Sequence, residues 1–417
     1  MAELTVTGGR RLMGEITVQG AKNSALPLLA ATFCIPAKCT LQNMPALSDV
    51  SATLSILRHL GCTARREGQS ITIDATTPAR YIIPESLMRE LRSSIFLLGP
   101  LLARFGRAEI FAPGGCNIGA RPIDLHLAAM KQMGATIRQT DEKIILRVPR
   151  GLHGADINLR FPSVGATENI IMAAAIARGT TQLHGAAREP EIVDLADFLN
   201  RCGAKISGAG KSDIVIEGVR RLHGCTYQVM PDRIIASSCL SAAALTGGEI
   251  LLRGVNHAHL APVLPAFRRM GCRVTAVNDA LHLYAPRRLV PFGALVTAPY
   301  PGFPTDSQSA FLAMACTASG VSRIKETIFE SRFHQAREFA KMGAHIAIRG
   351  SQAEIYGVPR LHGARVKAMD LRGGAALAVA ALGAHGQTTV TCAELIDRGW
   401  EDIAGTLRRI GANIAPS

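Results

Sequence analysis

A glycine-rich run from Pro113 to Arg121 contains a single thiol, that of Cys116. Three glycines in this run rule out a regular helix or strand and let the backbone move or approach a ligand closely. Arg107 precedes the run and Arg121 ends it, and a thiol in a mobile, electropositive loop ionises more readily than a buried one. The pattern fits a reactive thiol, and equally a surface cysteine of no consequence.

Charged or small polar side chains also stand at six places where an apolar, helix-forming run begins. The free N–H groups and the macrodipole of a helix make its N-terminus favourable for anions. Ordinary capping explains any one such position, but six of them rich in Lys and Arg indicate a site for a multiply anionic ligand. The residues concerned are Lys22, Asn23, Arg92, Ser163, Asp232, Arg233, Asp306, Asp370 and Arg372.

The elements that must position these side chains recur six times along the chain. A helical run, a turn glycine and an alternating, strand-like stretch follow one another every 68 to 73 residues. A glycine just past the last helical residue adopts the left-handed conformation that ends a helix, and alternation after it predicts a strand. The turn glycines are Gly61, Gly134, Gly203, Gly271, Gly343 and Gly411.

A second signature opens most of these units and precedes an Ala/Leu-rich helical run and another strand. It is seen in RLMGEITVQG, GLHGADINLR, RLHGCTYQVM and RLHGARVKAM. Each unit is therefore predicted to be βαβαβ. Units of about 70 residues exceed the usual solenoid range, so we expect an α/β protein with two globular domains of three units each.

Length and composition agree with this architecture. A chain of 417 residues exceeds what one hydrophobic core usually supports. The formal charge of +14 comes from scattered Lys and Arg with one Trp and five Tyr, which disfavours nucleic-acid binding and suits a cleft for anionic small molecules. No apolar run is long enough to cross a bilayer, and ten cysteines without framework spacing predict reduced thiols in a cytoplasmic protein.

The motifs PGGCNIGARPIDLH, GAKNSALPLL, FPTDSQ, DLRGGAAL and IDRGWED resemble those of the UDP-N-acetylglucosamine 1-carboxyvinyltransferases, which are enolpyruvyl transferases. The resemblance extends from Gly20 to the final LRRIGANI. It implies a two-domain inverse α/β barrel with residues 22–230 in the first domain, residues 1–21 and 231–417 in the second, and the active site in the cleft between them.

The resemblance also implies the reaction: transfer of the enolpyruvyl group of phosphoenolpyruvate to the 3-hydroxyl of UDP-N-acetylglucosamine, the first committed step of peptidoglycan precursor synthesis. Protonation at C3 and attack by the hydroxyl give a tetrahedral ketal, which then loses phosphate. This chemistry needs an acid, a base and fixed cations. By resemblance, Cys116 is the acid and also a site of covalent adduct formation, Asp306 is the base, and Asp370 is a second carboxylate. The implied phosphoenolpyruvate ligands are Lys22, Asn23, Arg121, Arg332, Arg372 and Arg398.

For the UDP-sugar, the resemblance implies contacts at several of the predicted helix starts and in the run from Arg121 to Leu125. His126 is a further candidate for a nucleotide contact, although a His between leucines is more often structural. Neither a metal nor a redox cofactor is implied, and the expected partners are the two small-molecule substrates. The implied UDP-sugar ligands are Asn23, Arg92, Arg121, Pro122, Ile123, Asp124, Leu125, Ser163, Val164, Gly165, Asp306 and Ile328.

Four positions depart from the usual family pattern: Phe161, Ile235, Ser238 and Ser307. They leave every proposed proton-transfer and phosphate-binding residue in place, but bear on acceptor choice and domain closure. Two alternatives therefore stay open. One is an enolpyruvyl transferase that uses another uridine nucleotide; the other is a non-catalytic nucleotide-binding paralogue. The shikimate-pathway enzyme shares the fold but lacks the cysteine loop.

Overall fold

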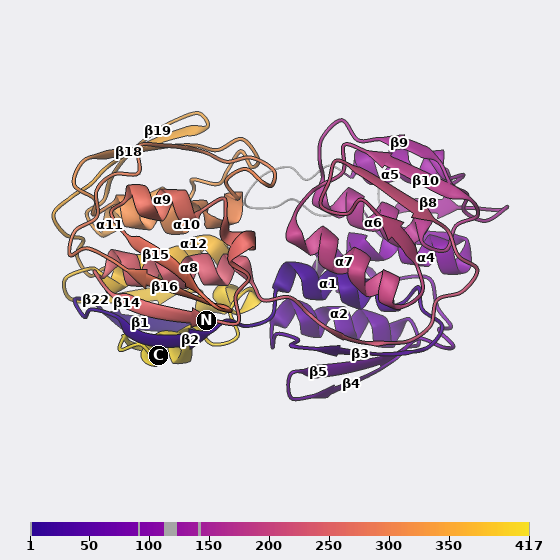
Figure 1. Cartoon of the computed structure of the whole chain (residues 1–417), viewed down its shortest axis with the longest axis horizontal. Coiled ribbons are helices and arrows are strands. Elements are labelled where there is room, and N and C mark those ends of the chain that lie inside the picture. Colours follow the sequence, from indigo (N-terminus) through magenta and orange to yellow (C-terminus); the bar gives the residue numbers. More distant parts are fainter. Residues whose placement is uncertain (1, 91, 112–122, 141–142, 417) are drawn as a thin grey trace. The chain divides into compact units, whose positions relative to one another are not determined.

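The computed structural model describes residues 2–90, 92–111, 123–140 and 143–416, with the backbone alone at 89, 90 and 92–94. These residues form two compact units (Figure 1). The N-terminal unit contains residues 20–111 and 123–230, and the C-terminal unit contains residues 2–19 and 231–416. Each unit has its own hydrophobic core.

The described part of the N-terminal unit contains three sheets, with strand orders β13-β3-β5-β4, β6-β8-β7 and β11-β12-β10-β9. Its strands are β3 (Lys38–Gln42), β4 (Thr63–Glu67), β5 (Ser70–Asp74), β6 (Arg107–Phe111), β7 (Thr136–Gln139), β8 (Lys143–Arg147), β9 (Asp156–Asn158), β10 (Thr180–His184), β11 (Lys205–Ser207), β12 (Asp213–Glu217) and β13 (Thr226–Gln228). Its helices are α1 (Lys22–Thr32), α2 (Ser48–His59), α3 (Glu85–Glu90), η1 (Arg92–Leu97), α4 (Leu98–Phe105), α5 (Asp124–Gln132), α6 (Val164–Ala174) and α7 (Pro190–Arg201).

The C-terminal unit also has three sheets in its described residues, with orders β21-β22-β1-β23, β15-β16-β14-β2 and β17-β18-β20-β19. Its strands are β1 (Glu3–Thr7), β2 (Met13–Thr17), β14 (Glu249–Arg253), β15 (Arg273–Val277), β16 (Ala280–Tyr284), β17 (Ala294–Val296), β18 (Val321–Lys325), β19 (His345–Arg349), β20 (Gln352–Tyr356), β21 (Arg365–Lys367), β22 (Gln387–Thr391) and β23 (Asn413–Pro416). Its helices are α8 (Arg233–Leu245), η2 (His257–Leu260), α9 (Leu264–Arg269), α10 (Thr305–Ala315), α11 (Ala336–Lys341), α12 (Leu371–Leu382), η3 (Ala393–Arg398) and α13 (Ile403–Arg408).

The repeating unit is βαβαββ rather than the predicted βαβαβ. In the sheet of β9 to β12, the first strand β9 is parallel to β10, and the β11–β12 hairpin is antiparallel to it. The sequence pattern predicts a single strand where the structure has two hairpin strands, because only a short turn separates them. The second repeat departs further, since α3, η1 and α4 stand where one first helix is predicted.

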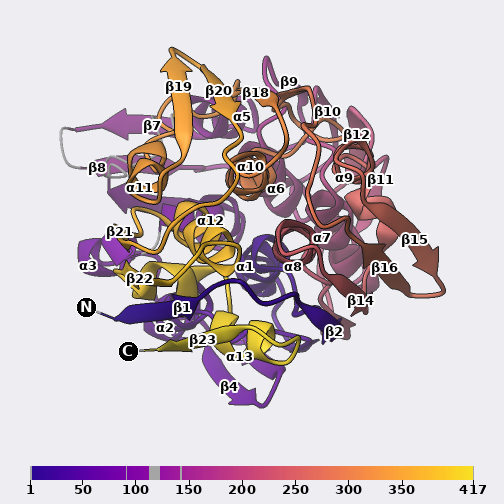
Figure 2. The ribbon, with the colours of Figure 1, turned by 90° about the vertical axis from the view of Figure 1, so that its left-hand side faces the viewer.

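The first strand of two repeats comes from a distant part of the chain. Near the N-terminus, β2 pairs in parallel with β14, and β13 pairs in parallel with β3. Strand β1 lies between β22 and β23, so the two ends of the chain share one sheet (Figure 2). The N-terminal 19 residues therefore complete two sheets of the C-terminal unit.

All six turn glycines have the predicted left-handed conformation, with φ between 87° and 101°. Each one ends the second helix of its repeat and leads into the hairpin. At Gly134, an added Cβ would lie 2.9 Å from the ring of His153, so steric contact as well as backbone conformation requires glycine there. The predicted helix ends are confirmed at these positions.

The first helices of the repeats form the interior of each unit. In the C-terminal unit, α8, α10 and α12 pack on one another and are buried over nearly their whole length (Figure 1). Their Ala-rich sequences allow this close packing. None of the helices among the described residues combines the length and the apolar character needed to cross a membrane.

One buried carboxyl group has no hydrogen-bond partner among the described residues. Glu168, on α6, is fully buried, and neither of its carboxylate oxygens has a hydrogen-bond partner there. Burial raises the pKa of Glu168 well above its ordinary range, and the nearby charges of Glu191 and Glu189 raise it further. An ionised Glu168 would therefore destabilise the folded state.

The pH dependence of stability tests this group. Below the ordinary glutamate pKa of about 4.5, Glu168 is protonated in both the folded and the unfolded state, and it does not lower the free energy of unfolding. As pH rises from there toward the raised folded-state pKa, the free energy of unfolding falls by about 1.4 kcal/mol per pH unit. Glu168→Gln should therefore raise the melting temperature at pH 8 and change it little at pH 4.5. The exposed Glu67→Gln is the control. If the melting temperatures of Glu168→Gln and the wild type differ by the same amount at every pH in this range, the interpretation is wrong.

Candidate active site

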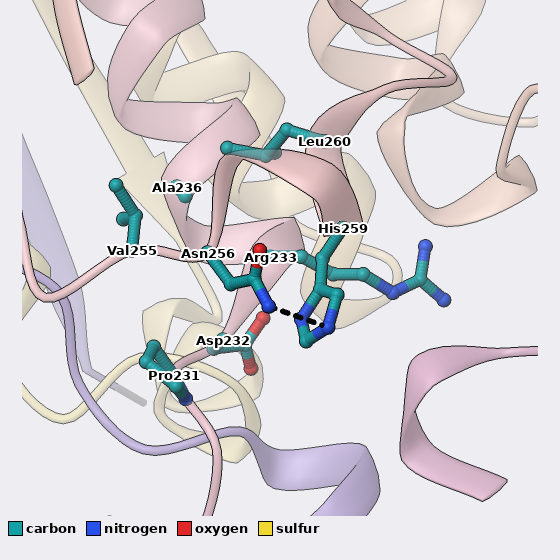
Figure 3. Close-up of a pocket in the computed structure, with 8 residues that line it drawn as sticks. All are labelled: Pro231, Asp232, Arg233, Ala236, Val255, Asn256, His259 and Leu260. Atoms are coloured by element: carbon teal, nitrogen blue, oxygen red, sulfur yellow. Dashed lines mark hydrogen bonds between the residues drawn. The ribbon is translucent and has the colours of Figure 1, made fainter. Parts of the chain in front are cut away.

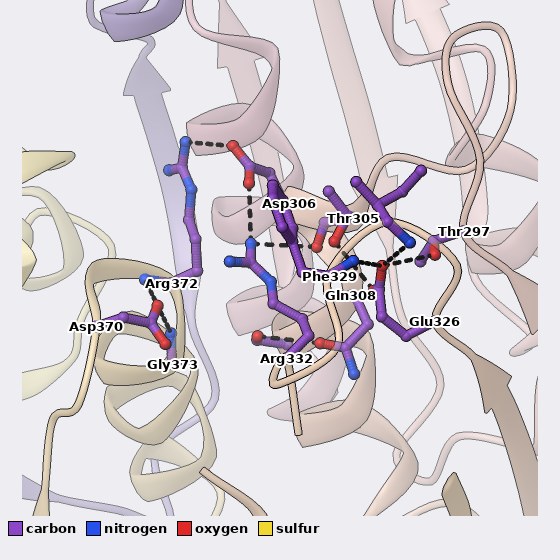
Figure 4. A network of polar contacts seen from close by, with 12 residues as sticks. Thr297, Thr305, Asp306, Gln308, Glu326, Phe329, Arg332, Asp370, Arg372 and Gly373 are labelled. Carbon is purple, nitrogen blue, oxygen red and sulfur yellow. Dashed lines mark hydrogen bonds and ion pairs between the residues drawn. The ribbon is translucent and has the colours of Figure 1, made fainter. Parts of the chain in front are cut away.

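The start of α10 carries a carboxylate held between two arginines (Figure 4). Asp306 Oδ1 accepts from Arg332 Nη2 at 2.8 Å, and Asp306 Oδ2 pairs with Arg372 Nη2 at 2.9 Å. Arg332 also donates to the carbonyl of Thr305 at 3.3 Å. The structure thus brings together three predicted site residues from α10, α12 and the loop after β18.

Exposure differs within this group in a way that suits ligand binding. The arginine side chains are only 2% and 6% exposed, for Arg332 and Arg372, whereas that of Asp306 is 26% exposed. The buried Nε of Arg332 has no hydrogen-bond partner among the described residues. Two guanidinium groups around one carboxylate leave an excess positive charge, and they retain donors for an anionic ligand.

Asp370 has a different environment. Its Oδ1 caps α12 by accepting from the backbone N–H groups of Arg372 at 2.7 Å and Gly373 at 3.0 Å. Its Oδ2 lies 2.8 Å from His334 Nε2. Burial raises the pKa of Asp370, but His334 and the positive charge of Arg332 outweigh burial, and the pKa falls to about 2. Asp370 is therefore an ionised cap and a weak base, better suited to holding the start of α12 than to accepting a proton.

Sequence reasoning missed the residue that holds this region together. Glu326, which follows β18 and is 4% exposed, accepts from the backbone N–H groups of Ile328 at 2.9 Å and Phe329 at 3.2 Å. Its carboxylate also accepts from the hydroxyls of Thr297 at 2.9 Å and Thr305 at 3.0 Å. It therefore joins the loop that carries Arg332 to the start of α10.

A shallow pocket lies at the start of α8 (Figure 3). Asp232 Oδ1 caps this helix by accepting from the N–H groups of Ile234 at 2.8 Å and Ile235 at 3.0 Å. The guanidinium of Arg233 lies 5.6 Å from the ring centre of Tyr300. As the sequence predicts, charged residues stand at this helix N-terminus, and one of them acts as a cap.

In the N-terminal unit, Lys22 begins α1 and its Nζ lies 2.7 Å from Asp49 Oδ2. Both side chains are buried, at 8% and 6% exposure. Asp49 stands in the first turn of α2, a position that no motif singled out. This ion pair fixes the ammonium group at the helix start.

Two other predicted segments of this unit meet at the starts of α5 and α6. Ile123 precedes α5, Asp124 begins it and is paired with Arg160, and the side chain of Ser163 caps α6 by accepting from Ala166 N at 3.3 Å. The two helices pack together. The structure thus brings the 123–125 and 163–165 segments to the same end of the unit.

His126 belongs to the packing of these helices. It is 6% exposed, and its Nδ1 lies 3.0 Å from Asn169 Nδ2. Burial lowers the pKa of His126 to about 4, so the ring is neutral near pH 7. A Cβ on Gly165 would lie 3.2 Å from this ring, which explains the glycine at that position. This environment fits a structural role for His126 rather than a ligand contact.

Most of the remaining predicted residues lie beside these groups. Leu125 is on α5 and Val164 begins α6, Asn23 follows Lys22 on α1, and Ile328 donates its N–H to Glu326. Arg398 ends η3. Cys116, Arg121 and Pro122 lie outside the described residues, as does the side chain of Arg92. Within the described residues, no group of three or more His, Cys, Asp or Glu is placed to hold a metal.

The family model described as EPSP synthase (3-phosphoshikimate 1-carboxyvinyltransferase) matches residues 6–407. The chain belongs to this family. A relative from Caldanaerobacter subterraneus named UDP-N-acetylglucosamine 1-carboxyvinyltransferase 2 is 46% identical over 414 residues, which cover 99% of each chain. A relative from Finegoldia magna, named UDP-N-acetylglucosamine 1-carboxyvinyltransferase, is 44% identical over 99% of this chain and 98% of its own.

Solved structures show the same fold. The enolpyruvyl transferase NikO from Streptomyces tendae superposes with a TM-score of 0.90 at 27% identity, over 100% of this chain and 99% of its own. EPSP synthase from Acinetobacter baumannii superposes with a TM-score of 0.74 at 19% identity, over all of both chains. The predicted two-domain α/β fold and the membership in a family of carboxyvinyltransferases are confirmed.

The role of Glu326 can be tested through stability. Glu326→Ala would leave four donors without their acceptor, one of them fully buried and three partly buried, and should lower the free energy of unfolding by about 2–4 kcal/mol. Glu326→Gln keeps an acceptor oxygen and should cost about 1 kcal/mol. Chemical denaturation measures both.

The matched control is Glu354→Ala, which removes a carboxylate from an ion pair with Arg323 in the same unit. Because the arginine of this pair is 64% exposed, the control should cost well under 1 kcal/mol. Equal losses for Glu326→Ala and Glu354→Ala would show that Glu326 does not hold the loop.

Proposed function

We propose that this chain transfers the enolpyruvyl group of phosphoenolpyruvate to the 3-hydroxyl of UDP-N-acetylglucosamine with release of phosphate. The full-length similarity to relatives named for this activity carries the proposal. The Asp306 group supports it, because the reaction brings two anionic substrates to a base. In this role the chain supplies a precursor for peptidoglycan synthesis.

Asp306 is the proposed base for the sugar hydroxyl. Each of its oxygens accepts a hydrogen bond from an arginine, and these two bonds hold the carboxylate in a fixed orientation. Its 26% exposure leaves it accessible, unlike the two arginines that orient it. Proton transfer needs an acceptor held in position, and this arrangement provides one.

Arg332 and Arg372 are the proposed partners of the phosphoenolpyruvate carboxylate. Their burial strengthens the field on a bound anion, since the effective dielectric constant is lower away from water. Lys22, held by Asp49, is the proposed phosphate partner in the N-terminal unit, together with Arg121 and Arg398.

Cys116 is the proposed proton donor to C3, and it rests on the sequence motif alone. The nucleotide is proposed to bind along residues 121–125 and 163–165, with Asn23, Arg92 and Ile328. The N-termini of α5 and α6 support this assignment, because the free N–H groups of two neighbouring helix starts favour a diphosphate.

The activity test compares acceptors. Phosphate release from phosphoenolpyruvate is measured with UDP-N-acetylglucosamine, UMP or shikimate 3-phosphate. We expect release with UDP-N-acetylglucosamine only, and a loss of about 100-fold or more in the Cys116→Ala variant. Release with UMP alone would overturn the acceptor assignment, and no release with any acceptor would overturn the enzyme assignment.

Asp306→Asn tests the base. The amide keeps the size of the side chain but cannot accept the proton, so kcat should fall by about 10²- to 10⁴-fold with a smaller change in KM. Glu354→Gln, which alters an exposed carboxylate–arginine pair of the same unit, should keep wild-type turnover. Turnover of Asp306→Asn within threefold of the wild type would show that another group takes the proton.

A further inference from the structure

Three cysteines from separate elements meet in the N-terminal unit, apart from the proposed substrate ligands. Cys202 follows α7, Cys39 lies on β3, and Cys225 immediately precedes β13. The Sγ atoms of Cys202 and Cys225 are 3.1 Å apart. The backbone N–H of Thr40 donates to the carbonyl of Cys225 at 2.9 Å, so the β3–β13 ladder fixes the segment that carries this thiol.

Comparison of the six repeats shows that two of these thiols, those of Cys202 and Cys225, are exceptions at their repeat positions. Cys202 immediately precedes a turn glycine, and the other five repeats have a large apolar residue there. Those residues are Leu60, Met133, Met270, Met342 and Ile410, all fully buried.

Cys225 follows the glycine of the LHG signature, and the other two copies of that signature have Ala155 and Ala364. Packing alone therefore does not require a thiol at either position. The two exceptions belong to neighbouring repeats, since Cys202 follows α7 and Cys225 leads into the β13 strand that pairs with β3, and their sulfur atoms are in contact.

The surroundings give the two thiols different access to solvent. Cys202 and Cys39 are fully buried, whereas Cys225 is partly exposed. A hydrogen bond with Cys202 lowers the pKa of Cys39, and the same contact raises the pKa of Cys202. Burial raises the pKa of Cys225, while the neighbouring charge of Arg201 acts in the opposite direction. A small oxidant would thus reach Cys225 first, with Cys202 behind it.

We propose that Cys202 and Cys225 form a reversible disulfide when the protein meets a peroxide. The Cys225 thiolate attacks one oxygen of hydrogen peroxide, which breaks the O–O bond and gives a sulfenic acid and hydroxide. Cys202 then attacks the sulfenic sulfur, and the sulfenic oxygen leaves as water. In total, two thiols and one hydrogen peroxide give one disulfide and two molecules of water.

The disulfide needs only a short movement of the side chains. The sulfur atoms must approach from 3.1 Å to the bond length of about 2.0 Å. The bond would close a loop between positions 23 apart in the sequence and link the end of α7 to the start of β13. Such a cross-link restricts the unfolded chain, so the oxidised form should melt at a higher temperature than the reduced form.

Peptide mapping tests the proposal on the full chain. A Cys116→Ala background removes the other thiol expected to react. The reduced protein is treated with hydrogen peroxide at pH 8.5 while folded, then unfolded, alkylated and digested with trypsin. Cys202 is released in residues 202–205, Cys225 in residues 222–233 and Cys39 in residues 39–58. We expect residues 202–205 linked to 222–233 in most molecules, and full release by dithiothreitol.

A second measurement uses stability. The melting temperature should rise by about 5 °C or more on oxidation, and it should return to its starting value with dithiothreitol. In Cys225→Ala, which places the alanine of the other LHG copies at this position, neither the linked peptide nor the shift should appear. Cys272→Ala removes a buried thiol of the other unit and should leave both in place.

Three outcomes would overturn the proposal. The first is alkylation of both Cys202 and Cys225 after treatment with peroxide. The second is linkage of Cys202 to the peptide that contains Cys39. The third is a linked peptide that forms only when oxidation follows unfolding.

Discussion

The first helices of the repeats are buried along nearly their whole length, and this constraint decides where charge can lie. On α8, α10 and α12, almost every residue after the first turn is inaccessible to solvent. An unpaired charge in the middle of such a helix would be strongly destabilising. Charged side chains therefore gather at the ends, where free N–H groups favour anions and solvent is close. The functional chemistry of the fold follows from this arrangement.

The group around Asp306 illustrates how such an end becomes a site. Asp306 at the start of α10 faces Arg372 from the start of α12, and Arg332 completes the group from a loop. The carboxylate neutralises one of the two guanidinium charges while no ligand is bound. Asp306 does not satisfy every donor of this network, because the buried Nε of Arg332 has no hydrogen-bond partner among the described residues. The proposed base and the proposed anion site are thus one electrostatic unit, and a change in either alters both.

Local signals explain what the sequence could predict. The six turn glycines, the helix starts and the repeat are encoded within short windows, and the structure has them where the patterns place them. The partners of the site residues are not local. Lys22 pairs with Asp49, and Asp370 pairs with His334, across 27 and 36 positions of sequence.

Glu326 was missed for the same reason. It carries no motif, and its role appears only when a strand end, a loop and a helix start meet around one carboxylate. The sequence pattern also failed to predict the separate hairpin strands and the broken first helix of the second repeat. There, tertiary packing selects among short apolar runs that look alike in sequence. Local chemistry can therefore be predicted from the sequence, and long-range pairing cannot.

The departures from the family pattern bear on how the site is supported. Ile235 is 2% exposed and belongs to the hydrophobic core of the C-terminal unit, and the hydroxyl of Ser238 donates to the carbonyl of Ile234 at 2.9 Å. Ser307 is also buried, and its Oγ has no hydrogen-bond partner among the described residues. These positions pack the helices behind the charged ends, so they act on the position of Asp306 rather than on its charge. A carboxylate that depends on two buried arginines for its orientation is sensitive to small shifts of α8 and α10. We therefore expect acceptor preference to vary within this fold while the proposed acid, base and cations stay the same.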